Sequence, residues 1–127
     1  MNDPLGRIET DTEADGLRLS LFGEVDLSNA GTLLKQIRRL IVRAGPERVV
    51  IDLSGVEYID SQGVMLLLEV ASTLRETGTP LSLVAPAQSV AGELLALSHL
   101  TDLPVQLTGE TGGWAPVSEP GADLSGR

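Results

Sequence analysis

Apolar and polar residues alternate near the start of the chain in a pattern that predicts two strands. Residues 17–21 are Leu-Arg-Leu-Ser-Leu, which is the period of a half-buried strand. A weaker alternation over residues 8–12 predicts an edge strand. The turn signal Asp15-Gly16 lies between the two runs and predicts a hairpin. Residues 23–26 are then expected to form a loop.

The next segment has the periodicity of an amphipathic helix. Its apolar stripe is formed by Leu33, Leu34, Ile37, Leu40 and Ile41. Ser28 or Asn29 is expected to cap the helix, and Gly45-Pro46 is expected to end it. Its basic residues, which lie on the other side, are Lys35, Arg38, Arg39 and Arg43. They form either a solvated face or a contact for an acidic partner surface.

A short continuous apolar run over residues 48–53 predicts a central strand, covered on both faces. A loop over residues 54–60 is expected to lead into a second helix from about 61 to 77, ended by Gly78 and Pro80. The buried stripe of this helix is predicted to consist of Val64, Leu67, Leu68, Ala71 and Leu74.

The remaining pattern predicts a strand over residues 81–84, a third helix over 90–97 with Leu94 and Leu97 facing inward, and a strand over 105–107. Alternating strands and helices indicate the α/β class, with a mixed, mostly parallel sheet of four to five strands. We expect a loose N-terminus over residues 1–7, one domain over 8–108 and a flexible Gly/Pro-rich tail over 109–127.

Composition excludes several classes of partner. The chain has 127 residues, of which 42% are hydrophobic, enough for one core. Aromatic residues make up 2% and the formal net charge is -9, which disfavours binding to nucleic acid and to anionic membranes. The longest apolar run, residues 64–68, is far shorter than the roughly 18 residues of a membrane span. A polar start then favours a cytoplasmic protein without membrane insertion.

The residues that carry most chemistry are scarce. The chain has no cysteine and one histidine, His99, which we expect at a helix end with its polar tip in water. No phosphate-binding glycine loop and no calcium-binding carboxylate pattern occurs. We therefore predict no catalytic residue, no metal and no cofactor, and an enzyme is the least favoured class.

The informative position is Asp60-Ser61, where the predicted second helix begins. Either side chain can accept a hydrogen bond from the first backbone N–H groups of the helix, and a purely structural cap is one interpretation. The other is that the serine hydroxyl is exposed at a helix start and can accept a phosphoryl group, which adds about -1.5 to -2 charges.

Four motifs, in this order and spacing, resemble the STAS family of anti-sigma factor antagonists. They are Gly23-Glu24-Val25-Asp26, the run Val-Val-Ile-Asp-Leu-Ser-Gly-Val at 49–56, Asp60-Ser61-Gln62-Gly63-Val64, and the run Leu-Ser-Leu-Val-Ala-Pro at 81–86. The resemblance covers roughly residues 8–108. It implies three to four helices, mainly on one face of the sheet.

The resemblance also implies a function. In this family, the serine after the motif aspartate is phosphorylated by a serine-protein kinase that is also the anti-sigma factor, and here that residue is Ser61. The unmodified form binds the anti-sigma factor and frees the sigma factor, and a phosphatase of the PP2C type restores it. The implied partner-binding residues are Asp26, Glu24, Asp60, Gln62 and Met65.

Two positions depart from the family pattern. Gln62 stands where Ser or Thr is frequent, and Met65 where Gly is frequent; Met65 either adds contact area or packs inside. A second hypothesis is a STAS scaffold or adaptor of a membrane transport or signalling complex that is never phosphorylated. Whether the chain also forms a weak homodimer is left open by the sequence.

Overall fold

The computed structural model describes residues 6–13, 16–97 and 105–108, with the backbone alone over 94–97 and 105–108. Strands and helices follow one another in the predicted order. They are β1 (Arg7–Thr12), β2 (Gly16–Val25), α1 (Ala30–Ala44), β3 (Arg48–Ile59), α2 (Ser61–Glu76), β4 (Leu81–Pro86), α3 (Val90–Leu97) and β5 (Val105–Thr108).

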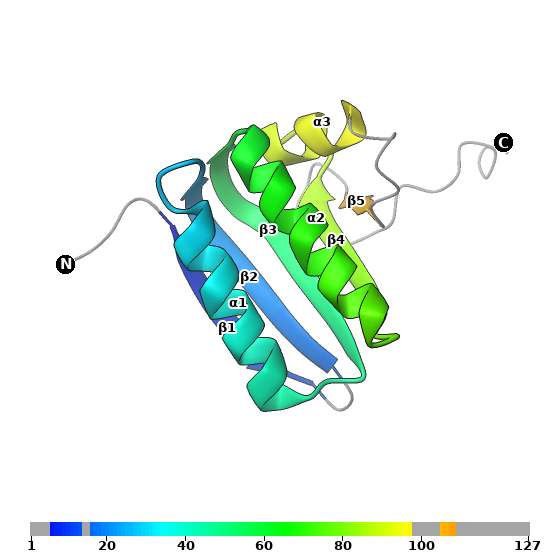
Figure 1. Ribbon diagram of the computed structural model, residues 1–127. Coiled ribbons are helices and arrows are strands. Elements are labelled where there is room, and N and C mark those ends of the chain that lie inside the picture. The colour runs from blue at the N-terminus through cyan, green and yellow to red at the C-terminus, as the bar shows by residue number, and fades with distance from the viewer. Residues whose placement is uncertain (1–5, 14–15, 98–104, 109–127) are drawn as a thin grey trace, which may run out of the picture.

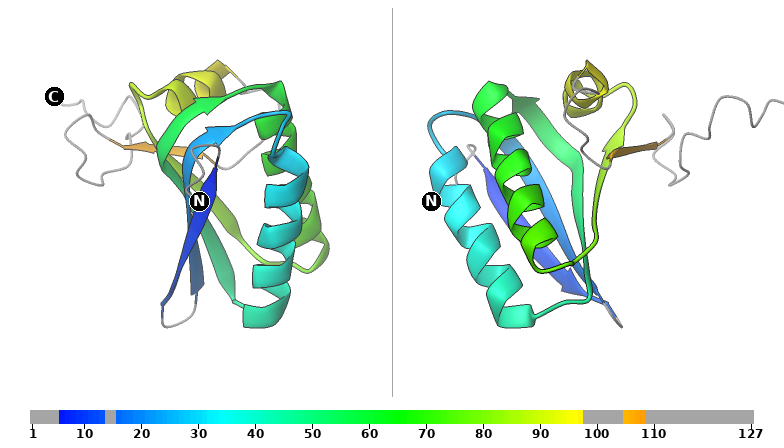
Figure 2. Two further views of the ribbon diagram at one scale, coloured as in Figure 1. Left: turned by 90° about the vertical axis from the view of Figure 1, so that its left-hand side faces the viewer. Right: turned by 45° about the vertical axis from the view of Figure 1, so that its right-hand side comes forward.

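The five strands form one sheet in the order β1-β2-β3-β4-β5, with β1 antiparallel to β2 and the other neighbours parallel. α1 and α2 lie side by side over one face of this sheet (Figure 1). α3 lies near the end of the sheet (Figure 2). The mixed, mostly parallel sheet with helices mainly on one face is therefore confirmed.

The core is aliphatic and lies between this face and the two helices. Leu19, Ile51 and Leu53 of the sheet are fully buried against Ile37 of α1 and Leu67 of α2. The predicted α1 stripe is confirmed: two of its members are buried and the other three pack partly against the core.

The predicted stripe of α2 is partly wrong. Leu66 and Val70 are buried, whereas Val64 and Leu68 are only partly buried. Residues 64–68 are all apolar, so periodicity alone left the rotation of the helix ambiguous.

Two segments that we expected to be loops are strand. β2 continues through most of residues 23–26 to Val25, and β3 continues through residues 54–59. Register shifts in the β2–β3 pairing, between Ser20 and Phe22 and between Gly23 and Glu24, interrupt the alternation without ending the pairing. Arg7, expected in the loose N-terminus, is likewise the first residue of β1.

The helix ends follow the predicted signals. α1 ends before Gly45, and Gly78 after α2 has φ 73°, a left-handed conformation that favours glycine. No described helix is long and apolar enough to cross a bilayer. The predictions for residues 1–5, for His99, for the side chains of Leu94 and Leu97 and for the tail over 109–127 lie outside the described residues.

Candidate functional site

Asp60 caps α2 and leaves the neighbouring hydroxyl uninvolved. Its Oδ1 accepts hydrogen bonds from the backbone N–H groups of Gln62 (2.8 Å) and Gly63 (3.1 Å). These donors belong to the unpaired first turn of the helix. Ser61 is the first residue of α2 and is exposed. Within the part of the chain that the structure describes, the Ser61 hydroxyl makes no side-chain hydrogen bond.

The same carboxylate holds the loop between β2 and α1. Its second oxygen, Oδ2, accepts a hydrogen bond from the backbone N–H of Leu27 at 3.2 Å. The backbone N–H of Asp60 donates in turn to the carbonyl oxygen of Val25 at 3.2 Å. Asp60 therefore joins the start of α2 to a loop 33 positions earlier in the chain.

Hydrogen bonds among its own residues also stabilise this loop. The Asp26 Oδ1 accepts from the backbone N–H of Ser28 (3.0 Å) and from its hydroxyl (2.6 Å). The Asn29 side chain accepts from the backbone N–H of Asp26 (2.9 Å) and donates to the carbonyl oxygen of Glu24 (2.7 Å). Asn29 stands at the N-cap of α1 but makes no side-chain cap hydrogen bond. The prediction that Ser28 or Asn29 caps α1 with its side chain is wrong, because both side chains bond within the loop.

Gly63 allows α2 to start close to the sheet. A Cβ atom at this position would lie 2.5 Å from Ile59 Cγ1 and 2.7 Å from the carbonyl oxygen of Val25. Both distances are shorter than real Cβ contacts, and one of the two atoms is backbone. The absence of a side chain at Gly63 therefore permits the first turn of α2 to lie against the end of β2.

We define the Ser61 surface as the residues around this helix start whose side chains reach solvent. They are Asp26, Leu27, Asp60, Ser61, Gln62 and Met65. Ser61 and Met65 are four positions apart on α2 and lie on one face of the helix. Met65 is 49% exposed, which decides between the two interpretations of this residue in favour of a surface position.

Sequence reasoning missed Leu27, which is 74% exposed. It is one apolar residue among polar residues in a loop, a weak signal because single exposed leucines are common on protein surfaces. The hydrogen bond from its backbone N–H holds it at Asp60, the residue before Ser61.

Glu24 is the most peripheral of the predicted site residues. It lies near the end of β2, is partly buried and pairs in register with Tyr58 of β3. Its backbone carbonyl supports the loop through Asn29. Together with Asp26 and Asp60 it makes this end of the sheet acidic, and neither aspartate has a lysine or arginine among its described hydrogen-bond partners.

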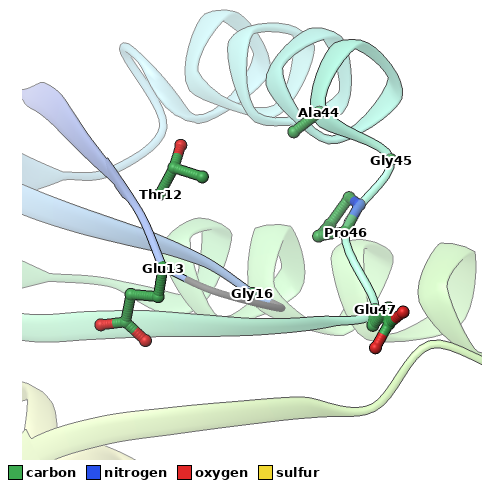
Figure 3. A pocket seen from close by; sticks show the side chains of 7 residues that line it. All are labelled: Thr12, Glu13, Gly16, Ala44, Gly45, Pro46 and Glu47. Carbon is green, nitrogen blue, oxygen red and sulfur yellow. The ribbon is translucent and has the colours of Figure 1, made fainter.

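No described group of three or more His, Cys, Asp or Glu side chains is arranged to hold a metal ion. A cavity of about 220 Å³ lies at the other end of β3 from Ser61 (Figure 3). Its ionisable lining residues are Glu13 and Glu47, each carried on a turn between elements. It therefore does not contribute to the Ser61 surface.

Sequence comparison finds similarity to an anti-sigma factor antagonist. The chain is 35% identical over 91 residues to the anti-sigma-F factor antagonist RsfB of Mycobacterium tuberculosis, covering 72% of this chain and 64% of that protein. It therefore spans less than two thirds of the length of this relative.

Solved structures share the fold at low sequence identity. An anti-sigma factor antagonist from Mycobacterium paratuberculosis superposes with a TM-score of 0.65 at 22% identity, covering 82% of this chain and 87% of that one. The antagonist SpoIIAA superposes in its unphosphorylated form (TM-score 0.65, 19% identity, 83% and 90% covered). The phosphorylated form of the Bacillus protein SpoIIAA superposes similarly (TM-score 0.62, 17% identity, 83% and 94% covered). The STAS domain model matches residues 7–111, and the chain belongs to the STAS domain family.

Proposed function

We propose that this protein is an anti-sigma factor antagonist controlled by phosphorylation of Ser61. The unphosphorylated form binds an anti-sigma factor that is also a serine-protein kinase, and so releases a sigma factor. Phosphorylation of Ser61 ends this binding, and a PP2C-type phosphatase restores it. The observation that carries the proposal is the exposed, uncommitted Ser61 hydroxyl beside the loop held by Asp60. The relatives named as antagonists support it.

The hydroxyl is available because its neighbour has taken over the capping role. Asp60 already accepts from two N–H groups of the first turn, so Ser61 gives up no helix-capping bond when it is modified. An exposed phosphate at a helix N-terminus also benefits from the helix dipole, by about 0.3–1 kcal/mol. The fold therefore accommodates both forms of the residue, and SpoIIAA has been solved in both.

The same phosphate is unfavourable once a partner covers the surface. Asp60 directly precedes Ser61, and Asp26 belongs to the loop that Asp60 holds; both supply negative charge without a described basic partner. Burying an unpaired charge in an interface costs on the order of 3–5 kcal/mol. At about 1.4 kcal/mol for each tenfold change, the affinity falls roughly a hundredfold or more. A switch of this size needs no change of fold.

The unmodified surface has the composition of a small binding site. Leu27 on the loop and Met65 on α2 provide exposed apolar side chains. Gln62 and the two aspartates provide polar groups around them. Apolar anchors surrounded by polar residues are typical of the energetically important part of protein–protein interfaces.

The proposal is tested by incubating the protein with ATP and the histidine-kinase-like ATPases of the same genome, followed by intact-mass and peptide mapping. The expected result is one added phosphoryl group on Ser61, absent from Ser61→Ala. Ser28→Ala is the matched control, because Ser28 is a nearby exposed serine whose hydroxyl is bonded to Asp26. A phosphoryl group mapped to any other residue contradicts the site. Binding of a transport or signalling complex without any phosphorylation favours the scaffold hypothesis instead.

A further inference from the structure

A groove runs between the edge strand β1 and α1, away from the Ser61 surface. It has a volume of about 460 Å³. The residues that line it are Ile8, Thr10, Gln36, Arg39, Leu40 and Arg43. Those from α1 recur at intervals of three and four residues and so form one face of the helix. α1 runs alongside β1 in the fold (Figure 1).

The groove has an apolar floor and a basic rim. Ile8 and Leu40 are partly buried and pack against the core. Arg39 and Arg43 are exposed. The acidic residues Glu9 and Asp11 of β1 alternate with Ile8 and Thr10, and therefore point to the opposite face of the sheet. These two carboxylates of β1 therefore do not neutralise the positive charge of Arg39 and Arg43.

The charge of this region differs from that of the chain. α1 carries four of the nine basic residues and no acidic residue, in a chain of formal net charge -9. Arg38 reaches Glu69 at 3.5 Å. Among the described residues, Arg39 and Arg43 have no ion-pair partner. Two guanidinium groups are thus available to carboxylates from outside.

β1 adds a second means of recognition. Within the described sheet it pairs with β2 alone, so its other edge presents backbone N–H and C=O groups that no neighbouring strand pairs. An extended peptide that adds to such an edge gains main-chain hydrogen bonds, and its alternate side chains enter the adjacent groove. A helix beside an edge strand is a suitable geometry for this mode of binding.

We propose that this groove binds an acidic, extended segment of a partner protein, added as a strand to β1. Arg39 and Arg43 are four residues apart, which corresponds to about 6 Å along a helix axis. Alternate residues of a strand are about 6.7 Å apart, so carboxylates at positions i and i+2 match the two arginines. An aliphatic side chain at the next alternate position covers Ile8 and Leu40.

The groove shares no residue with the Ser61 surface, so this inference does not depend on the proposed function. Ser61→Asp is expected to bind the acidic segment as the unmodified protein does. Failure of one proposal therefore leaves the other unaffected.

The test is an NMR titration of the full-length ¹⁵N-labelled chain with blocked heptapeptides. The probes are Thr-Asp-Thr-Asp-Thr-Val-Thr and its reverse, and the control is Thr-Asp-Asp-Thr-Thr-Val-Thr, which has the same composition but places the carboxylates on opposite faces. The expected result is shifts confined to residues 7–12 and 36–43, slower exchange of β1 amides, and weaker binding of the control peptide.

Single charge reversals test whether the two arginines of the rim bind the carboxylates of the peptide. Arg39→Glu and Arg43→Glu are each expected to weaken binding by about tenfold, which corresponds to about 1.4 kcal/mol. Arg75→Glu, an exposed arginine in the last turn of α2, is the matched control and is expected to bind normally. The proposal is overturned if neither probe shifts the resonances of β1 and α1, or if the control peptide binds as tightly as the probes. It is also overturned if this face instead binds anionic phosphatidylglycerol vesicles or a second copy of the chain.

Discussion

The carboxylate of Asp60 accepts a hydrogen bond from the backbone N–H of Leu27 with one oxygen and caps α2 with the other. One side chain thereby joins the loop that carries an exposed leucine to the helix start that carries Ser61. The Ser61 surface depends on this contact.

Asp60→Asn is expected to lower the free energy of unfolding by about 1–2 kcal/mol, because an amide has one acceptor oxygen in place of two. Urea denaturation measures the loss, and hydrogen exchange at the Leu27 amide reports the loosened loop. Glu76→Gln, which removes an exposed carboxylate at the other end of α2, serves as control. Unchanged stability together with unchanged protection of the Leu27 amide contradicts the role given to Asp60.

Gly63→Ala is expected to destabilise the protein by about 1–3 kcal/mol, since the added methyl group clashes with Ile59 and with the backbone of Val25. The control is Gly31→Ala in α1, where an added Cβ meets nothing within 4 Å. There, alanine should be neutral or stabilising by up to about 1 kcal/mol. Thermal unfolding of both variants checks the contrast, which fails if the two substitutions have similar effects.

Leu27→Ala and Met65→Ala are each expected to weaken anti-sigma factor binding by about tenfold, because exposed apolar side chains at the centre of an interface contribute most of its energy. Stability should change by less than about 0.5 kcal/mol, since neither side chain belongs to the core. Val42→Ala, an exposed apolar residue of α1, is the control. Affinities for the anti-sigma factor are measured by calorimetric titration, and Val42→Ala should leave the affinity unchanged. A loss of affinity in Val42→Ala as large as in the other two variants argues against this contact surface.

Asp52 makes stability depend on pH. Burial raises the pKa of this carboxyl group, but hydrogen bonds from Ser54 and the ion pair with Arg18 outweigh burial, and the net pKa is lowered. A carboxyl group with a lowered folded-state pKa stabilises the protein above its unfolded pKa of about 3.9, and this contribution is lost as the pH falls through the folded pKa.

Asp52→Asn is therefore expected to lower stability by about 1 kcal/mol at pH 7, and the difference from the parent protein should shrink below about pH 4. Chemical denaturation across pH 2–7 measures it, with Glu57→Gln, an exposed acid of β3, as control. A difference that is constant over this range rules out ionisation of Asp52 as its cause.

The sequence predicted the order of elements and the two ends of α2 well, because these depend on local periodicity, on capping residues such as Asp60, and on turn residues such as Gly78 and Pro80. It did not predict that β3 extends to Ile59. Polar Ser54 and Glu57 are exposed near its end, and register shifts break the alternation that marks a strand. Where a strand ends at a sheet margin, the local pattern no longer distinguishes it from a loop.

The predicted site residues stay a prediction, but the structure decides which residue caps α2. Asp60 and Ser61 are both good capping residues, so the pattern left the cap open, and the structure assigns it to Asp60. Leu27 is held at Asp60 by a hydrogen bond between residues 33 positions apart. A pattern of neighbouring residues in the sequence cannot predict such a contact. The mutual placement of loop and helix is a property of the folded sheet.

The most direct test of the central claim is calorimetric titration of the anti-sigma factor with Ser61→Ala and Ser61→Asp. Ser61→Ala adds no charge to the surface and should bind with the affinity of the unmodified protein. Ser61→Asp places a negative charge beside Asp26 and Asp60 and should weaken binding by roughly tenfold to a hundredfold while the fold stays intact. Equal affinity of the two folded variants would contradict the account.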